Sequence, residues 1–455
     1  MRRIMRYRVR LLTACLALIL TASFPQSGAA AERVANWNAV AVSATVRSGH
    51  NGVVQSRALA ITQVAVHDAL NAIERRYTPY ALDGTTDPSA APDAAVAAAA
   101  HDALVGLIAV GALPFVGFGS ATQQAAAVAF VNLQYAADLA TIPDGPAKTR
   151  GVAVGQAAAR AVLARRSSDG ATTFVPYIPG TRPGDWQPTP NPSPFDPPAA
   201  GERLPAVLPG WGQVTPFVLR SSSQFEPDPP PSLDSRRYTR DYDEVMAIGE
   251  KSSVSRTPEQ TQIARFWYEG SAAGWSRIAR VVGEVRNLDS WQSARLLALI
   301  NLAMADGFIA GMETKYTFNF WRPVTAIRAG DTDGNDDTIA DPNWSSLLNS
   351  PAIPDYTSTH SILGAAAAAV LRRFFDDDEV PFQTTSGAPF AGITRAFQSF
   401  SEAARENGQS RIYAGIHFRS AVEEGIRQGS RIGRFVFTHA LRPTEGDDDE
   451  RDRKR

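Results

Sequence analysis

The chain has 455 residues, of which 44% are hydrophobic, and this is enough apolar material for one large core or two smaller ones. Its formal net charge of −1 excludes an overall field that would attract nucleic acid or an acidic membrane surface. The single cysteine, Cys15, lies close to the N-terminus. If the N-terminal segment is removed, disulfides, thiolate catalysis and cysteine metal sites are excluded for the mature protein.

The first 31 residues have the composition of an export signal. Five arginines precede or begin an apolar stretch at residues 11–22, and Ala29, Ala30 and Ala31 offer small residues for cleavage. The apolar stretch is too short to span a membrane comfortably, although an uncleaved anchor is the alternative. We therefore expect a signal peptide at 1–31 and a periplasmic or secreted protein without stable membrane insertion of the mature chain.

Helical periodicity begins soon after this signal. Apolar spacing and the absence of interrupting prolines predict helices over 53–76, 90–110, 123–139 and 149–166, within an N-terminal helical region at 32–170. His67 and His101 lie in these helices. We interpret both as structural histidines and assign them no chemistry.

A proline-rich segment follows at residues 171–235. Sixteen prolines lie between residues 176 and 231, and each lacks an N–H donor, so regular secondary structure cannot dominate there. The segment also contains large aromatic residues, which a free linker would not need: Trp186, Phe195, Trp211 and Phe217. We expect a long ordered segment wrapped over helices, with a disordered linker as the alternative.

The last part of the chain returns to helical patterning. Helices are predicted from residue 236 onward, over 288–314, 361–375, 391–406 and 421–441, and from Thr257, where Thr, Pro and Gln form a good helix start. These helices would form a C-terminal catalytic helical region at 236–442, followed by a disordered charged tail at 443–455. Alternating β-branched runs are scarce. The predicted class is all-α, with the helices packed as bundles.

Three short segments in this region combine cations, hydroxyls and histidines. They are residues 315–323 (KYTFNFWRP), 356–361 (YTSTHS) and 410–417 (SRIYAGIH). Arginine offers a planar fork of donors, lysine a point charge and serine a hydroxyl. A histidine ring nitrogen can attack, ligate or move protons. Together these groups suit a tetrahedral oxyanion such as phosphate or vanadate.

Local sequence rules predict how the segments are shaped. Pro323 disfavours helix at Arg322, so this side chain should leave a helix end. The Ser/Thr-rich turn before the Ala-rich helix would present free N–H groups to an anion. Arg411 and His417 are six residues apart, which is not a same-face helical spacing, so Gly415 should mark a break between them.

The three segments resemble the three-part signature of the superfamily of vanadium-dependent haloperoxidases and type 2 phosphatidic acid phosphatases. The resemblance implies helical bundles of the haloperoxidase/acid phosphatase type. It also implies that vanadate oxygens are held by Lys315, Arg322, Arg411, Ser358 and the Thr359 amide. His417 would bind vanadium, and His360 would be the acid–base group. Phosphate fits the same site, because the two anions share geometry and charge.

The signature also has departures from the usual family pattern. Thr359 stands where the family has Gly, and Thr357 where it has Pro. Ala421 replaces the usual Asp that orients the histidine, and Glu424, one turn further on, is the candidate substitute. Ile353 occupies the position that differs between chloroperoxidases and bromoperoxidases, so the choice of halide is not readable.

An acidic run at residues 331–337 alternates oxygen-bearing side chains in the manner of a calcium loop. However, Asp336 stands where such a loop needs Gly, and Pro342 where it needs Glu. We therefore interpret the run as an acidic surface turn.

The leading hypothesis is a vanadate-dependent haloperoxidase that uses hydrogen peroxide to oxidise a halide. One alternative is an acid phosphatase that hydrolyses phosphate monoesters through a phosphohistidine at His417. Another is a catalytically silent anion-binding protein, suggested by Ala421. The expected partners are hydrogen peroxide and a halide or small organic substrate, with no nucleic acid. The sequence does not indicate an oligomeric state.

Overall fold

The computed structural model describes residues 27–110, 117–189 and 206–444. Within these ranges the regular secondary structure is almost entirely helical, apart from two short strands that pair as one antiparallel hairpin. The α-helices are α1 (Ser27–Arg47), α2 (Gly52–Asn71), α3 (Pro92–Ile108), α4 (Ala121–Ala140), α5 (Pro146–Arg166), α6 (Arg236–Gly249), α7 (Pro258–Phe266), α8 (Ser271–Val285), α9 (Ser290–Phe318), α10 (Pro323–Arg328), α11 (Thr359–Phe375), α12 (Phe400–Tyr413) and α13 (Arg419–His439). The 3-10 helices are η1 (Trp211–Gln213) and η2 (Gly330–Thr332), and the strands are β1 (Phe382–Thr385) and β2 (Thr394–Phe397).

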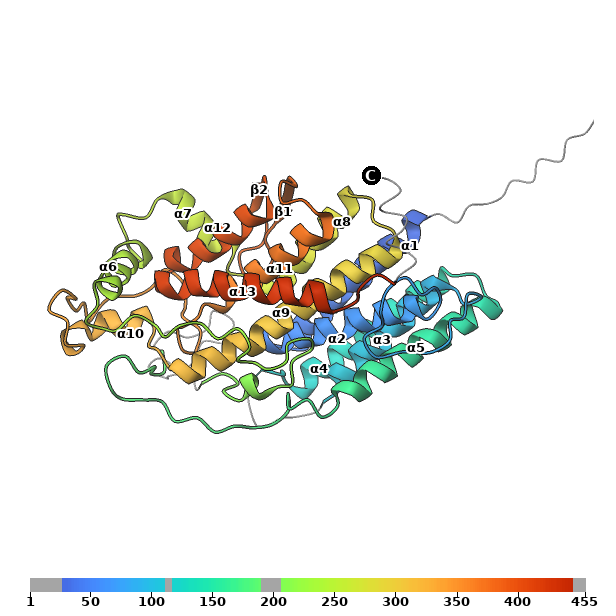
Figure 1. Cartoon of the computed structure of the whole chain (residues 1–455), viewed down its shortest axis with the longest axis horizontal. Coiled ribbons are helices and arrows are strands. Elements are labelled where there is room, and N and C mark those ends of the chain that lie inside the picture. Colours follow the sequence, from blue (N-terminus) through green and yellow to red (C-terminus); the bar gives the residue numbers. More distant parts are fainter. Residues whose placement is uncertain (1–26, 111–116, 190–205, 445–455) are drawn as a thin grey trace, which may run out of the picture.

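Helix α9 runs through the middle of the molecule (Figure 1) and contacts α1, α2, α8, α11 and α13. Helices α3, α4 and α5 gather at one end, and α6 and α10 lie at the other (Figure 1). By length and hydropathy α9 could cross a membrane, but 94% of its apolar window is buried inside the protein. Helix α9 therefore forms the centre of the hydrophobic core.

Most of the predicted helices are present, with shifted ends. The helix start at Thr257 is confirmed: its side chain accepts a hydrogen bond from Gln260 N, and the Gln260 side chain reciprocates. Helices α1 and α8 were not predicted. Both pack against α9, and α8 has buried and exposed faces, which is the pattern of an amphipathic helix.

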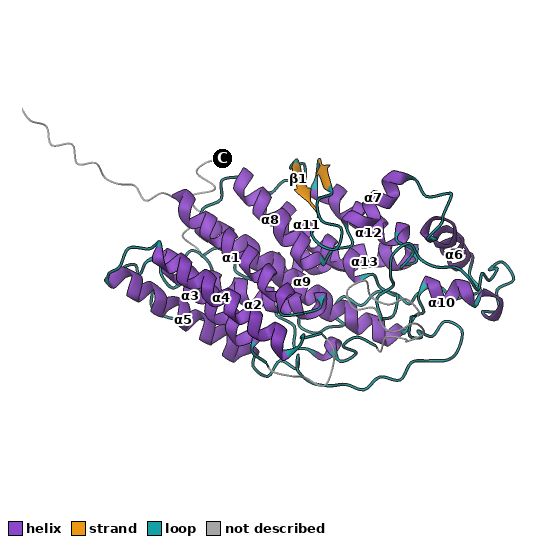
Figure 2. Ribbon diagram, turned by 180° about the vertical axis from the view of Figure 1, so that it is seen from behind, coloured by secondary structure: helices purple, strands orange, loops and turns teal. Residues whose placement is uncertain are grey.

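The predicted helix at 391–406 is wrong in its first half. Residues 394–397 form strand β2, which lies beside β1 (Figure 2). The pairing of the two strands places Phe397 opposite Phe382. The rings of these two residues lie 5.3 Å apart, and both are buried. Helix α12 starts only at Phe400, because Ser399 caps it by accepting a hydrogen bond from Glu402 N. Cross-strand burial of aromatic rings therefore outweighs the local helical pattern.

The described parts of the proline-rich segment pack on the helices, as expected. Trp186, Trp211 and Phe217 are buried, and Asp306 of α9 accepts hydrogen bonds from Phe217, Val218 and Leu219 N–H groups. Phe195 lies outside the described residues. A loop that contains the beginning of this segment runs along one long edge of the helices (Figure 2).

The structure covers little of the two predicted terminal segments. Residues 27–31 of the expected signal belong to α1, and residues 1–26 lie outside the described part. The tail was predicted to be disordered from residue 443, which is too early. Pro443 pairs with Tyr77, and Thr444 N donates to Arg76 O at 3.0 Å. The remainder, 445–455, lies outside the described residues.

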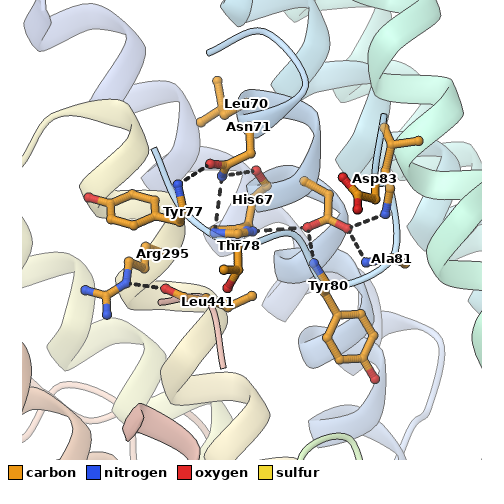
Figure 3. A network of polar contacts seen from close by, with 12 residues as sticks. His67, Leu70, Asn71, Tyr77, Thr78, Tyr80, Ala81, Asp83, Arg295 and Leu441 are labelled. Carbon is orange, nitrogen blue, oxygen red and sulfur yellow. Dashed lines mark hydrogen bonds and ion pairs between the residues drawn. The ribbon is translucent and has the colours of Figure 1, made fainter. Parts of the chain in front are cut away.

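His67 belongs to a buried structural network (Figure 3). Its Nδ1 lies 3.1 Å from the Asp68 carboxylate, and its Nε2 lies 3.2 Å from Asn71 Nδ2. The Asp68 carboxylate also accepts three backbone N–H bonds from the loop after α2, at Tyr80, Ala81 and Leu82. All three polar residues are at most 1% exposed, so their role is to hold the loop to the core.

His101 also has a structural setting. Its ring lies 2.7 Å from Asp102 and 2.9 Å from Asn132 of α4, and it stacks on Tyr135 of the same helix. These contacts join α3 to α4, in agreement with the interpretation of this histidine as structural.

Glycines set how closely α13 approaches α11. Gly425, Gly429 and Gly433 recur every fourth residue on the face of α13 that packs on α11. A Cβ atom at these positions would lie 2.7, 2.1 and 2.3 Å from carbonyl oxygens of Ser358, Ile362 and Ala366, respectively. Only glycine permits this approach. Because α11 carries the second segment and α13 follows the third, the stripe fixes the distance between them.

Candidate active site

The first segment is split between two helices. Helix α9 ends at Phe318, and Asn319 adopts a left-handed conformation with φ of 48°. Arg322 is the N-cap of α10, with extended φ and ψ of −82° and 154°. This confirms that Pro323 keeps Arg322 out of a helix, and it means that Lys315 and Arg322 do not share one continuous helix.

Backbone carbonyls of the loop before the second segment fix both of these cations. The Lys315 ammonium donates to Pro354 O and Asp355 O, each at 2.8 Å. Arg322 Nε donates to Ile353 O at 2.7 Å. Neither side chain is exposed to solvent. The loop at 353–355 therefore holds the two cations in place through its carbonyl groups.

The second segment forms the start of α11. Ser358 is the N-cap, and its side chain accepts a hydrogen bond from Ser361 N. Thr359 is the first helical residue, where backbone N–H groups have no partner within the helix. His360 Nε2 lies 3.1 Å from Glu269 O. Because a carbonyl can only accept, Nε2 carries the proton of the neutral ring and Nδ1 is left as an acceptor.

The third segment changes direction at Gly415, as predicted. Helix α12 ends at Tyr413, Gly415 has φ of +77°, and α13 begins at Arg419. A Cβ on Gly415 would lie 2.2 Å from Gly249 O, so neither the backbone angle nor the space admits a side chain. This turn allows both Arg411 and His417 to face the same interior region.

The structure brings the cations of the first and third segments together. Arg322 Nη1 donates to Ile416 O at 2.7 Å and lies 3.1 Å from His417 Nε2. Arg411 Nη1 donates to Trp267 O at 2.8 Å, and its guanidinium lies 5.6 Å from the Tyr268 ring centre. The charges of Arg322, Lys315 and Arg411 all act on His417. Residues more than ninety positions apart thus share one electrostatic environment.

The charges at this site do not balance. Lys315, Arg322 and Arg411 are each at most 1% exposed. Among the residues that the structure describes, Asp355 is the one carboxylate within 4 Å of these cations, 3.8 Å from Arg322. Burying three cations beside one carboxylate is costly unless an anion joins them.

The direction of the pKa shifts reflects this imbalance. Burial, followed by repulsion from Arg322, lowers the pKa of Lys315 well below its usual range. Burial lowers the pKa of Arg322 and of Arg411 to about 10. Burial and the neighbouring cations likewise lower the pKa of His360 and His417 well below the usual value, so both rings are neutral. Each shift disfavours additional positive charge and would be relieved by an oxyanion.

The donor set fits an oxyanion. Arg322 Nη2 and Arg411 Nε are buried and have no hydrogen-bond partner within the described chain. Buried guanidinium donors rarely remain unpaired. These two donors, the Lys315 ammonium, the Ser358 hydroxyl and the N–H groups at the start of α11 are the kinds of group that a phosphate or vanadate oxygen set requires.

Two departures from the usual signature are accommodated by packing. The Thr359 methyl group faces Gly311 of α9, where an added Cβ would lie 3.1 Å from it. Thr359 is helical, so it needs no glycine-like backbone angle. Thr357 donates to Gln428 Oε1 at 2.9 Å, and Gln428 donates to Thr314 at 3.1 Å. This buried chain ties the second segment to α13 and α9.

The suggestion that Glu424 orients His417 is wrong. Its carboxylate pairs with Arg427, at 2.9 Å from that side chain's Nε, one turn along the same helix. The carboxylate that contacts His417 belongs to Asp355, whose Oδ1 lies 2.8 Å from Nδ1. Sequence reasoning missed it. The available signal was an acidic residue in an otherwise apolar stretch, one position before the second segment.

A second feature that the sequence did not reveal is the turn after α7. Backbone carbonyls of Trp267 and Glu269 accept from Arg411 and His360, respectively, and Tyr268 lies between them. The Glu269 carboxylate is in turn held by Arg277 and by Gly387 N–H. This turn therefore positions Arg411 and His360 through its main-chain carbonyl groups. Because these contacts do not depend on particular side chains, the sequence contains no pattern that predicts them.

The acidic run at 331–337 lies apart from this chemistry. Asp333 accepts hydrogen bonds from Asn335 N and the Thr338 hydroxyl, and Asn335 donates to Leu233 O. Among the described residues there is no cluster of three or more His, Cys, Asp or Glu side chains that could hold a metal ion. These contacts fit a closed acidic turn.

Comparisons with known proteins agree with this architecture. Residues 295–446 match the family model described as the VCPO second helical-bundle domain. The vanadium chloroperoxidase of Curvularia inaequalis is 27% identical over 282 residues, which are 46% of this chain and 45% of that protein. The alignment thus spans less than half the length of that relative.

Two solved structures resemble nearly the whole chain. The first bacterial vanadium-dependent iodoperoxidase is 26% identical, with a TM-score of 0.74 over 91% of this chain and 98% of that one. An apo bacterial vanadium-dependent chloroperoxidase has a TM-score of 0.68 over 86% of this chain and 94% of that one, but only 19% identity, which bears on the fold alone. Taken with the family model and the mostly helical fold, these similarities identify the chain as a member of the superfamily of vanadium-dependent haloperoxidases and type 2 phosphatidic acid phosphatases.

Proposed function

We propose that the protein is a vanadate-dependent haloperoxidase that oxidises a halide with hydrogen peroxide. The observation that supports this most directly is the pair of buried, unpartnered guanidinium N–H groups, on Arg322 and Arg411, in the region that His417 faces. Such an arrangement attracts a tetrahedral oxyanion to the neighbourhood of a neutral imidazole. The similarity to vanadium haloperoxidases supports vanadate among the oxyanions of this shape.

Each site residue has a role in this proposal. Lys315, Arg322 and Arg411 would hold the negatively charged oxygens, helped by the Ser358 hydroxyl and the Thr359 N–H group. His417 would bind vanadium through Nε2. Bound vanadate supplies the Lewis-acid centre that activates peroxide toward a halide. The protein's own contribution is a dry cage of fixed donors that needs no rearrangement during the reaction.

His360 would move the protons. Its Nε2 is engaged by Glu269 O, so the other ring nitrogen is the one that can accept a proton from peroxide and return it. The ring is neutral, so this nitrogen has a free lone pair, and a bound oxyanion would offset the cations that lower the pKa of His360. The substrates would be hydrogen peroxide and a halide or a small organic molecule, and we propose that the protein acts outside the cytoplasm after export.

The test is to add orthovanadate to the purified protein and to follow peroxide-dependent oxidation of bromide and iodide alongside hydrolysis of a phosphate monoester. We expect halide oxidation that requires vanadate and is suppressed by excess phosphate. Arg411→Gln should abolish it, whereas Arg286→Gln should not, because Arg286 pairs with Asp377 on the surface.

Other outcomes would overturn the proposal. Ester hydrolysis without halide oxidation would identify a phosphatase that uses His417 as the nucleophile. Retention of vanadate with neither activity would identify an anion-binding protein.

A further inference from the structure

Asp355 lies closest to His417 among the carboxylates that the structure describes. It is completely buried, one residue before the second segment, and its Oδ1 lies 2.8 Å from His417 Nδ1. The two residues are 62 positions apart in the sequence, and Asp355 lies outside the third segment, which contains His417. The contact therefore exists only in the folded protein.

The contacts of the His417 ring select one tautomer. Arg322 Nη1 lies 3.1 Å from Nε2 and 3.5 Å from Nδ1, so Nε2 is its nearer neighbour. A guanidinium group can only donate, so Nε2 must present its lone pair. In a neutral ring the proton then lies on Nδ1, which is 2.8 Å from Asp355 Oδ1; neither oxygen of this buried carboxyl group has a hydrogen-bond partner within the described chain, so both can accept a proton donor. Only this neutral tautomer presents a lone pair to Arg322 and an N–H group to Asp355.

The backbone on either side of this carboxylate is fixed. Asp355 N donates to Phe320 O at 2.8 Å, and Asp355 O accepts from the Lys315 ammonium, also at 2.8 Å. The residue is thus anchored to the loop after α9 on one side and to a site cation on the other. These two bonds fix the position of the backbone from which the carboxylate reaches His417.

We propose that Asp355 is the positioning residue of His417: it holds the proton on Nδ1 and directs the Nε2 lone pair to the oxyanion. It would orient the histidine in place of the usual Asp, which Ala421 replaces in this chain. This inference rests on the proposed function insofar as the oxyanion is vanadate. A carboxylate behind a ligating histidine fixes the ring and raises its basicity, and its loss typically lowers metal affinity about 10–100-fold.

The first test uses the wild-type protein alone. Histidine labelled with ¹⁵N reports which ring nitrogen carries the proton, and the His417→Ala variant assigns the signal. We expect Nδ1 to be protonated and Nε2 to be unprotonated in the protein free of oxyanion. A proton on Nε2 would overturn the proposal, whatever the activity of the protein proves to be.

The second test measures affinity by equilibrium dialysis, with orthovanadate and with inorganic phosphate as separate probes. Asp355→Asn keeps the size of the side chain but removes its charge, and it should weaken the binding of orthovanadate about 10–100-fold while mixing the two tautomers. Phosphate, which forms no coordinate bond to His417, should lose less affinity. Glu424→Gln is the matched control, because it removes a carboxylate that pairs with Arg427 instead, and it should change neither readout.

The two proposals fail in different ways. If wild-type protein binds phosphate but shows no halide oxidation with vanadate, the proposed function fails while the tautomer and the affinity loss still establish the role of Asp355. If Asp355→Asn binds both anions as tightly as wild type and keeps Nδ1 protonated, the positioning role is wrong. If that variant does not fold, the wild-type tautomer decides the question.

Discussion

Gly429 of α13 lies directly against the carbonyl oxygen of Ile362 in α11, where an added Cβ would come within 2.1 Å of that oxygen. This contact lies at the middle of the glycine stripe that joins the helix carrying His360 to the helix that follows His417. The relative position of the two histidines therefore depends on a residue that contacts neither of them.

Gly429→Ala tests this dependence. The new methyl group must push α13 away from α11, and overpacking of this kind costs about 1–3 kcal/mol. We expect a lower Tm and weaker vanadate binding, measured by thermal unfolding and equilibrium dialysis. Gly84→Ala is the control, since nothing lies within 4 Å of its added Cβ. Equal stability of the two variants would contradict the close packing of these helices.

The two histidines should respond differently to removal. His417→Ala removes the proposed bond to vanadium, so vanadate retention and turnover should both be lost. His360→Ala removes a proton-transfer group, typically worth about 10²–10⁴-fold in rate, but leaves the cations and His417 in place. It should still bind vanadate, more weakly, and turn over slowly. Dialysis and halide oxidation on both folded variants measure this, and the reverse pattern would mean that the roles are exchanged.

Asp68 should matter for stability and not for the chemistry. Its carboxylate accepts three backbone N–H bonds, and the amide of Asp68→Asn would leave one or more of them without an acceptor. Loss of hydrogen bonds to a buried charge costs about 2–3 kcal/mol. Urea unfolding should show this loss, whereas the affinity for vanadate at pH 7 should be unchanged.

Asp83→Asn serves as the comparison for this experiment. Asp83 belongs to the same loop, but its side chain is 81% exposed. Asp83→Asn should therefore leave the urea concentration at the midpoint of unfolding unchanged. If both variants lose the same stability, the buried network does not hold the loop.

His50 should make the protein less stable in acid. Burial, and secondarily Arg57, lowers its pKa from 6.5 to about 4, and neither ring nitrogen has a hydrogen-bond partner within the described chain. Between these two pH values the unfolded chain binds a proton that the folded protein does not. This contribution to stability is therefore fully present above pH 6.5 and falls by up to about 3 kcal/mol as the pH drops to 4.

The measurement compares wild type with His50→Leu. The free energy of unfolding of the variant should decline less between pH 7 and pH 4.5, because the titrating group is absent. Parallel pH profiles would show that His50 does not titrate at a lowered pKa in the folded protein.

The sequence by itself determined the features that depend on neighbouring residues. Apolar periodicity located most of the helices, and the cap at Thr257 marked the start of α7. Pro323 kept Arg322 out of a helix, and Gly415 marked the turn between Arg411 and His417. The cations, hydroxyls and histidines of the three segments also indicated the kind of ligand, because that chemistry is a property of the side chains themselves.

Only the tertiary structure decided which groups meet. Asp355 reaches His417 across 62 residues, and the carbonyls of Trp267 and Glu269 hold Arg411 and His360. Main-chain carbonyls are the same in every residue, so no sequence pattern can point to them. Strand β2 was missed for a related reason: burial of Phe397 against Phe382 depends on a partner strand, whereas helical periodicity is visible within one segment. Local rules therefore describe the elements, and long-range packing selects the contacts that orient the site.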